Sequence, residues 1–361
     1  MVTVTHSGFI KRTKADEYRS QHRGGKGIKG TKLREDDVVD HFFLTSTHNW
    51  LLFFTNKGRV YRIKAYELPE GSRDSKGQHV ANLLQFAPDE SIQTVLSIPN
   101  YEVSKYLVLA TRSGKVKKTP LAEYDSPRQG GLIAVRLMAD ENGENADELI
   151  GAALCNAEDD IILVSKLGMS LKFQADDEQL RPMGRQTAGV QGMKFREGDE
   201  LLAMDVVWGD SDKDLFVVTN EGFAKRTAIS EYRLQGRNGF GVKAVQLAEG
   251  RGSLVGAVIV EEDDQIMAIM KSGKVIRSNV DEVKRTGRTT QGVTFAKPDK
   301  NDEIISIARN EEKDDESAES GESAEKTESG TNATGNEGAS ASSEAATEAN
   351  AGNGDGENVE A

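Results

Sequence analysis

Short apolar runs and glycine-ended turns alternate along the first 310 residues. Each run is rich in β-branched, aromatic or leucine residues, and an extended stretch follows each turn. This pattern is typical of a β-hairpin in which a late glycine adopts positive φ. The turn glycines are Gly8, Gly58, Gly114, Gly168, Gly222 and Gly273. The runs before them are Val2–Val4, Leu51–Phe54, Tyr106–Ala110, Ile161–Val164, Leu215–Val218 and Ile266–Ile269.

A second glycine follows each turn glycine after 17 to 21 residues, and one more apolar run then closes the unit. We name these the closing glycines: Gly27, Gly77, Gly131, Gly189, Gly241 and Gly292. The closing runs are Val38–Leu44, Ile92–Ile98, Leu149–Leu154, Leu201–Val207, Leu254–Val260 and Ile304–Ala308. Successive turn glycines lie 50 to 56 residues apart. A repeat of this length with about four strands predicts an all-β, propeller-like disc of six four-stranded blades.

The phase of the repeat predicts how the blades close. The chain enters the repeat at the second strand of a unit, Val2–Val4, and its last apolar run, Ile304–Ala308, has the place of a first strand. If the first unit lacked a strand, the last run could fill the gap and remove two open sheet edges. We therefore expect residues 303–308 to lie beside residues 2–5.

The composition changes after residue 310. Val359 is the only Val, Ile, Leu, Met or aromatic residue in 311–361. Such a segment buries too little apolar surface to offset the entropy lost on ordering. The sequence predicts a β domain over 1–310 and a disordered acidic tail over 311–361.

The net charge of −13 belongs to the tail, which holds 15 acidic and 2 basic residues. The rest of the chain has 46 − 2 = 44 Lys and Arg and 59 − 15 = 44 Asp and Glu, so its net charge is zero. A neutral body with segregated basic clusters is compatible with binding to nucleic acid.

Basic residues recur at one position of the repeat, four residues beyond each turn glycine. Six of six positions are basic, and other cations lie nearby. Repeated geometry would place such charges around a rim, the arrangement expected for contacts to DNA phosphates. At a single position, a solubilising side chain would explain the charge equally well. The predicted rim comprises Lys11, Arg12, Arg62, Lys64, Lys117, Lys118, Lys172, Lys225, Arg226, Lys274 and Arg277, with Lys14 and Lys115 close to it.

The loop of the first unit carries the strongest local motif, which we name the box: Gln21, His22, Arg23, Gly24, Gly25, Lys26 and Gly27. Its glycines allow close approach of the backbone to phosphates, and two cations flank them. It lacks the glycine spacing of a Walker A loop. Later loops retain parts of it, as in Arg237-Asn-Gly-Phe-Gly241.

Six such repeats with a Gln-x-Arg-Gly-Gly-Lys-Gly box resemble the C-terminal DNA-wrapping domain of the bacterial DNA gyrase A chain. The resemblance covers residues 2 to about 310 and departs from the usual motif at His22, where arginine is common. It implies a β-pinwheel whose blades exchange strands, and duplex DNA wrapped on a basic rim with positive handedness. It also implies that the box joins the first blade to the last.

The resemblance further implies that this part of the protein is not itself an enzyme. It would serve an ATP-dependent type IIA topoisomerase that introduces negative supercoils, in a heterotetramer of gyrase A and gyrase B chains. ATP and Mg would bind to other domains or chains of that enzyme, and we expect no catalytic residue, metal or cofactor in this chain. We also consider the acidic tail a possible competitor of DNA for the rim.

We expect a cytoplasmic, nucleoid-associated bacterial protein, because the chain has one cysteine, Cys155, and no long apolar stretch. Two other functions stay open. One is the DNA-bending C-terminal domain of a topoisomerase IV-like protein, which usually has a degenerate box. The other is a propeller that binds proteins, although repeated Trp-Asp or Gly-His signatures are absent from the sequence.

Overall fold

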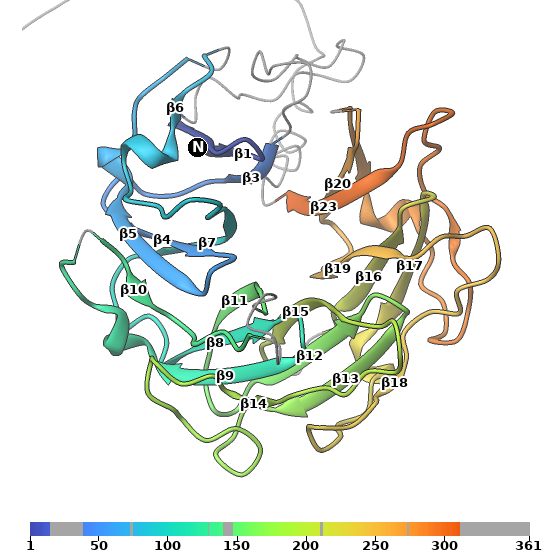
Figure 1. Cartoon of the computed structure of the whole chain (residues 1–361). Helices are drawn as coiled ribbons and strands as arrows, with labels where there is room; N and C mark the ends of the chain where they lie inside the picture. The colour runs from blue at the N-terminus through green and yellow to red at the C-terminus, as the bar shows by residue number, and fades with distance from the viewer. Residues whose placement is uncertain are drawn as a thin grey trace, which may run out of the picture. The chain divides into compact units, whose positions relative to one another are not determined.

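The computed structural model describes residues 1–14, 39–72, 75–128, 130–139, 147–209, 212–272 and 274–310. They form six antiparallel sheets set around a common centre (Figure 1). The all-β, six-bladed fold predicted from the sequence is confirmed. The box, Gly273 and the tail lie outside the described residues.

Each blade is built on one hairpin. The first strands are β1 (Val2–Thr5), β4 (Trp50–Thr55), β8 (Tyr106–Thr111), β12 (Asp160–Ser165), β16 (Asp214–Thr219) and β20 (Gln265–Met270). The second strands are β2 (Phe9–Arg12), β5 (Arg59–Lys64), β9 (Lys115–Pro120), β13 (Met169–Gln174), β17 (Phe223–Ala228) and β21 (Val275–Asn279). The described turn glycines all have positive φ, between 69° at Gly58 and 84° at Gly168, as the hairpin pattern predicted.

The closing run of each unit forms the innermost strand of its own blade. These strands are β3 (Val39–Phe43), β7 (Ile92–Ile98), β11 (Leu149–Cys155), β15 (Leu201–Val207), β19 (Leu254–Val260) and β23 (Ile304–Asn310). Each pairs with the first strand of its hairpin, and the register shifts once near the turn in every pair.

The outermost strand of a blade comes from the following unit. It has two residues and pairs with the second strand of the preceding hairpin. These outer strands are β6 (Gln78–His79), β10 (Leu132–Ile133), β14 (Val190–Gln191), β18 (Val242–Lys243) and β22 (Val293–Thr294). The blades therefore exchange strands, as the resemblance implied. Among the described residues, the sixth sheet has three strands, in the order β21-β20-β23.

The predicted pairing of residues 303–308 with residues 2–5 is wrong. Strand β23 pairs with β20 of its own unit, and β1 already has β3 and β2 as neighbours. Within the described residues this closing run is not a spare strand, because it belongs to the hairpin that precedes it. The first and last blades instead approach through their innermost strands, β3 and β23.

The hydrophobic core lies between blades. Along β4, Leu52 and Phe54 pack against the third blade, whereas Leu51 and Phe53 pack against the first. A strand buried on both faces explains why these runs are continuously apolar instead of alternating. Five such clusters of buried residues join consecutive blades within the described part of the chain.

We name the segment between a second strand and the next outer strand the outer loop. Short 3-10 helices connect second strands to the outer loops, namely η2 (Ala65–Glu67), η4 (Leu121–Tyr124), η5 (Ile229–Glu231) and η6 (Val280–Glu282). A further 3-10 helix, η3 (Val80–Asn82), directly follows the outer strand β6. None of the helices in the described ranges is long and apolar enough to cross a membrane.

Candidate nucleic-acid interface

The basic residues four positions beyond the turn glycines lie on the second strands, and most of them meet acidic partners. The Arg12 guanidinium lies 2.8 Å from a Glu70 carboxylate oxygen, and Lys118 Nζ lies 2.9 Å from Asp177. Arg62 pairs with Asp125 and lies over the Trp50 ring, 4.3 Å from its centroid. At this repeated position, the basic side chain is therefore already paired with an acidic residue of the same chain.

In the fourth and fifth blades, the basic side chain at the same position also lies close to a carboxylate. Lys172 Nζ lies 3.4 Å from Asp160, and Arg226 Nε lies 3.4 Å from Asp214. The side chain of Lys118 is fully buried, and the exposed fraction of Arg226 is 4%. These cations lie at the junctions between blades, since the backbones of Lys118 and Arg226 bridge to the next unit at Pro182 and Arg285.

A second set of lysines, three positions beyond the turn glycines, is buried in alternate blades. We name Lys11, Lys117 and Lys225 the buried lysines. Lys11 Nζ donates to the carbonyl oxygens of Ser72, at 3.1 Å, and Ser75, at 2.8 Å. Lys117 donates to the carbonyls of Ala134 and Arg185. Lys225 donates to the carbonyls of Ala244 and Arg288.

Desolvation alters the titration of two of these lysines. Burial lowers the pKa of Lys117 to about 7 and that of Lys225 to about 8. One accepting carbonyl directly follows the outer strand that the lysine's own unit contributes, and the other lies in the outer loop of the next unit. Each ammonium group therefore holds exchanged segments together through backbone carbonyls.

This placement differs from the solvent-facing band expected from the sequence. Lys11, Lys117, Lys118, Lys225 and Arg226 are all buried. A phosphate cannot reach these groups while the outer strand and its loop cover them. The sequence reasoning missed this cover, because the covering residues lie about 60 positions away along the chain, as Lys118 and Asp177 do.

The remaining predicted rim residues are more accessible. Lys64 lies over the Trp50 ring and donates to the His48 carbonyl at 2.7 Å. Lys274 is exposed and lies 3.6 Å from Asp299. Arg277 lies on β21 and donates to Gln265 of the neighbouring strand.

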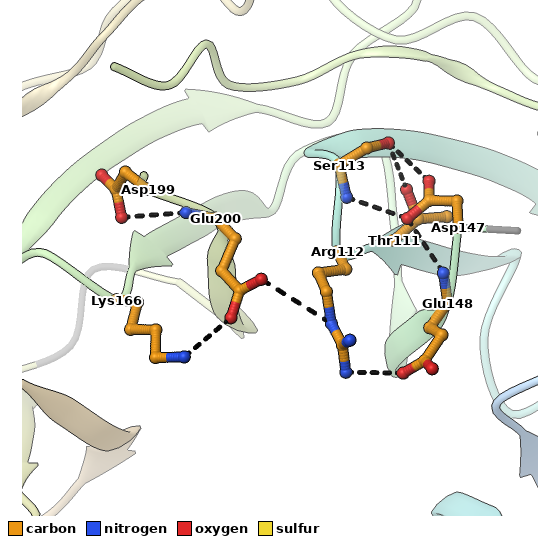
Figure 2. A network of polar contacts seen from close by, with 8 residues as sticks. All are labelled: Thr111, Arg112, Ser113, Asp147, Glu148, Lys166, Asp199 and Glu200. Carbon is orange, nitrogen blue, oxygen red and sulfur yellow. Dashed lines mark hydrogen bonds and ion pairs between the residues drawn. The ribbon is translucent and has the colours of Figure 1, made fainter. Parts of the chain in front are cut away.

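The hairpin turns form another region in which charges are paired (Figure 2). In the third blade, Arg112 of the turn forms ion pairs with Glu148 of its own blade and Glu200 of the next. In the fourth blade, Lys166 lies 2.9 Å from the same Glu200. The sixth blade repeats the arrangement with Lys271 and Glu303, 3.0 Å apart.

A second acidic residue fixes the turn backbone beside these pairs. Asp147 accepts hydrogen bonds from Ser113 and from the Glu148 amide, and Asp199 accepts one from the Glu200 amide (Figure 2). Asp199 also accepts a hydrogen bond from the Ser165 hydroxyl. The acidic residues just before the closing runs therefore form ion pairs with the turn cations and accept hydrogen bonds from the turn residues. The cations of these turns are already paired, which makes the turns of the third, fourth and sixth blades poor contacts for a polyanion. Lys57, in the turn of the second blade, is exposed and forms no ion pair within the described residues.

Arginines of the outer loops connect one outer strand to the next. Each lies four residues before a closing glycine and donates through Nη1 to the carbonyl of the second residue of the preceding unit's outer strand. The pairs are Arg185 with Ile133 at 2.8 Å, Arg237 with Gln191 at 3.1 Å and Arg288 with Lys243 at 2.9 Å. These arginines fix the outer edge of the blades.

Exposed cations lie beside these fixed loops, five residues beyond the closing glycines. We name Arg136, Lys194 and Lys297 the edge cations. All three are exposed, and none forms an ion pair with another described residue. The backbone sets the position of two of them: the amide of Arg136 donates to Thr187 at 3.1 Å, and that of Lys194 donates to Gly239 at 2.8 Å.

The sequence reasoning missed the edge cations, although counting from the closing glycines finds them. The same position holds Lys32 in the first unit, Asn82 in the second and Gln246 in the fifth. Other exposed cations share the outer loops and their flanks. They are Arg128, Arg181, Arg233, Lys243 and Lys284. An outer edge with uncompensated charge can attract a phosphate backbone.

No group of three His, Cys, Asp or Glu side chains within the described ranges could hold a metal ion. Cys155 is buried, and desolvation raises the pKa of its thiol to about 12. A thiol in that environment stays protonated and unreactive.

Comparison with protein families adds a match along the whole β region. The model described as "DNA gyrase C-terminal domain, beta-propeller" matches residues 1–46, 49–99, 105–156, 159–207, 213–261 and 264–311. Each of the six stretches covers one repeat unit.

Two relatives illustrate the similarity of sequence. The DNA gyrase A chain of Streptomyces coelicolor is 59% identical over 312 residues, covering 86% of this chain and 36% of that protein. The gyrase A chain of Mycolicibacterium smegmatis is 54% identical over 315 residues, covering 87% and 36%. The chain thus spans about a third of the length of these relatives.

Two solved structures share the fold. A structure of the DNA gyrase A C-terminal domain gives a TM-score of 0.69 at 29% identity, covering 85% of this chain and 98% of that one. The C-terminal domain of DNA topoisomerase IV also gives 0.69, at 27% identity, covering 85% and 92%. The fold alone does not separate the two, whereas the relatives of high identity are gyrase A chains.

Proposed function

Because the chain belongs to the family of the DNA gyrase C-terminal β-propeller domain, we propose that it binds duplex DNA along its outer edge and wraps it around the blades. The observation that carries this proposal is the division of charge. The hairpin turns of the third, fourth and sixth blades pair their cations with acids, whereas Arg136, Lys194 and Lys297 are exposed and lack ion pairs within the described residues.

The distribution of these cations suits a bend better than a straight contact. Bending 20–30 base pairs by 40–90° costs about 1–6 kcal/mol, so a wrap needs contacts over its whole length. Edge cations from the third, fourth and sixth units supply separated contacts, each of which releases counterions. DNA bendability would then set any sequence preference, because phosphate contacts carry no sequence information.

The wider activity is part of the proposal. We expect the wrap to have positive handedness, and the parent type IIA topoisomerase to use it to introduce negative supercoils with ATP. The remainder of the gyrase A chain and the gyrase B chain would be its partners, and ATP and Mg would bind there. A cytoplasmic, nucleoid-associated location agrees with that role.

The box stays a proposed part of the interface. In each of the first five blades, the two residues after the next unit's closing glycine pair with the second strand. The second strand of the sixth blade, β21, has no such neighbour among the described residues. The resemblance implies that the box joins the first and last blades. Arg23→Ala/Lys26→Ala should therefore abolish wrapping while retaining much of the affinity for DNA.

The acidic tail is a proposed competitor for the edge cations. Its 15 acidic residues outnumber its 2 basic ones, so it carries the whole net charge of the chain. A flexible tether of this length has a root-mean-square span of roughly 40 Å, and tethering gives an effective concentration of about millimolar. The tail would then weaken DNA binding without occupying a folded site.

Two variants with equal net charge test the proposed edge. The edge variant is Arg136→Gln/Lys194→Gln/Lys297→Gln. The turn variant is Arg112→Gln/Lys166→Gln/Lys271→Gln. Affinity for duplex DNA is measured at several salt concentrations for both. The edge variant should bind about tenfold or more weakly, with a salt slope reduced by about 2.7, because each phosphate contact contributes about 0.9.

The turn variant should bind DNA nearly as well as the unaltered chain, because its cations are already paired. Equal losses in both variants would show that only net charge matters. Unchanged binding in the edge variant would place the DNA elsewhere.

A further inference from the structure

One outer loop carries an exposed aromatic side chain next to its closing glycine. Phe240 precedes the closing glycine Gly241, and 49% of its surface is exposed. The corresponding residues of the other described outer loops are Lys76, Gly130, Ala188 and Gln291. The box has Lys26 at this place. A large exposed phenylalanine therefore distinguishes the loop 235–241 from the other loops of the same edge.

The backbone of this loop is held on both sides of Phe240. The amide of Gln235 donates to Lys172 at 2.8 Å, and that of Asn238 donates to Gly192 at 2.6 Å. Gly241 has φ of 72°, and a Cβ there would lie 2.1 Å from the Ser170 carbonyl oxygen. The backbone of Gly241 therefore packs directly against the neighbouring strand.

The Arg237 side chain adds further anchors. Its guanidinium donates to the carbonyls of Gln179 and Gln191, and its backbone amide donates to the Gln179 side chain. The loop is thus fixed to two segments outside its own unit, and it presents the ring of Phe240 from a rigid base.

Three exposed cations are linked to this loop by one backbone contact or by their place in the sequence. Lys194, an edge cation, bonds through its amide to Gly239, the residue before Phe240. Lys243 and Arg233 are exposed on either side of the loop in the sequence. An apolar side chain set among phosphate-binding groups has the chemistry of the wedges that DNA-bending proteins insert between base steps.

We propose that Phe240 inserts partway between adjacent base pairs of the bound duplex and kinks it. The proposal rests on DNA binding at the outer edge and assigns a site of local unstacking within the wrap. The fifth unit lacks an edge cation, with Gln246 at that position. A kink there replaces the bending force that a phosphate contact supplies in the neighbouring units.

Flexible pyrimidine–purine steps are the easiest to unstack. The chain should therefore prefer to place TA or CA steps at Phe240. This preference would fix which base pairs of the wrapped DNA lie at Phe240, without any contact to a base edge.

Fluorescence of 2-aminopurine tests the proposal. A duplex carries the base in place of adenine at every TA step, so that any binding register reports unstacking. Binding of the unaltered full chain should raise the fluorescence about twofold. Phe240→Ala should remove most of that rise, and Phe240→Leu should keep much of it.

Leu234→Ala is the matched control, because Leu234 is 55% exposed and precedes the anchored segment. It should leave the fluorescence rise intact. An unaltered chain that binds without any rise, or a Phe240→Ala variant with the full rise, would overturn the wedge. If the unaltered chain does not bind the duplex at all, DNA binding at the edge fails, which anisotropy of an end-labelled duplex distinguishes.

Discussion

The buried lysines and the edge cations are both sets of basic residues that recur along the chain. The first set is buried, whereas the second is exposed to solvent. Lys117 and Lys225 are 1% exposed and donate to backbone carbonyls. Arg136, Lys194 and Lys297 are exposed, lie three residues beyond an outer strand and lack ion pairs to described residues. One set joins blades, and the other is available to a polyanion.

The difference between the two sets comes from strand exchange. Lys117 and Lys118 are adjacent in β9, so strand alternation should expose one of them. Both are buried because β14 and its preceding loop, which belong to the next unit, cover the strand. A cation on a second strand therefore supports the fold, whereas an edge cation, three residues beyond an outer strand, stays exposed.

The largest expected effect comes from removing a buried cation. Lys118→Ala leaves the Ala175 carbonyl without its donor and empties space beside Tyr106. The free energy of unfolding should fall by about 3 kcal/mol, as for other large-to-small changes in a core. Urea denaturation measures the change.

Lys194→Ala is the control for that experiment, because Lys194 is exposed at the edge. Its effect on unfolding should stay within about 0.5 kcal/mol. Similar losses in the two variants would contradict the division between structural and DNA-facing cations.

The second effect is a dependence of stability on pH. Folding lowers the pKa of Lys117 to about 7 and of Lys225 to about 8, from 10.5 in the unfolded chain. Between these values the unfolded chain binds more protons, so stability rises with pH. The slope reaches about 1.4 kcal/mol per pH unit for each lysine.

Lys117→Met/Lys225→Met should flatten this rise between pH 7 and 9. The rise is opposed at higher pH because burial raises the pKa of Cys155 from 9.0 to about 12, and its ionisation in the unfolded chain then lowers stability. Unfolding curves at several pH values give the slope. An unchanged slope would mean that the two ammonium groups keep ordinary proton affinities.

The smallest expected effect concerns the tail. Removing 311–361 should strengthen DNA binding a few-fold, about 1 kcal/mol, because a tethered competitor is lost. The same truncation should have little effect in the edge variant, whose binding surface has lost its charge. Fluorescence anisotropy measures both pairs. An equal gain in both backgrounds would indicate general charge repulsion instead of competition for the edge.

Much of the fold follows from the sequence, because its longer strands are largely apolar runs that recur at similar places relative to the repeated glycines. Leu51–Phe54 and Ile92–Ile98 are recognisable in this way. Outer strands such as Leu132–Ile133 are not, because two residues carry no periodic signal. The predicted pairing of β23 is wrong for a related reason: a run of apolar residues does not specify which neighbour it joins.

The candidate site is harder to predict than the fold. Lysine in a strand normally indicates a solvent-facing position, and Lys118 departs from this because its partners lie in a later unit. The edge cations recur at a fixed distance from the closing glycines, but glutamine and asparagine interrupt the series at Gln246 and Asn82. Only the structure shows which basic positions remain uncovered.

The most direct test of the account is the topology of wrapped DNA. Nicked circular plasmid is sealed by ligase in the presence of the chain, the protein is removed, and the linking-number distribution is compared with that of plasmid sealed alone. The account predicts a positive shift for the unaltered chain and the turn variant, and loss of that shift for the edge variant Arg136→Gln/Lys194→Gln/Lys297→Gln. A full shift with the edge variant, or no shift from an unaltered chain that binds the plasmid, would contradict wrapping along the outer edge.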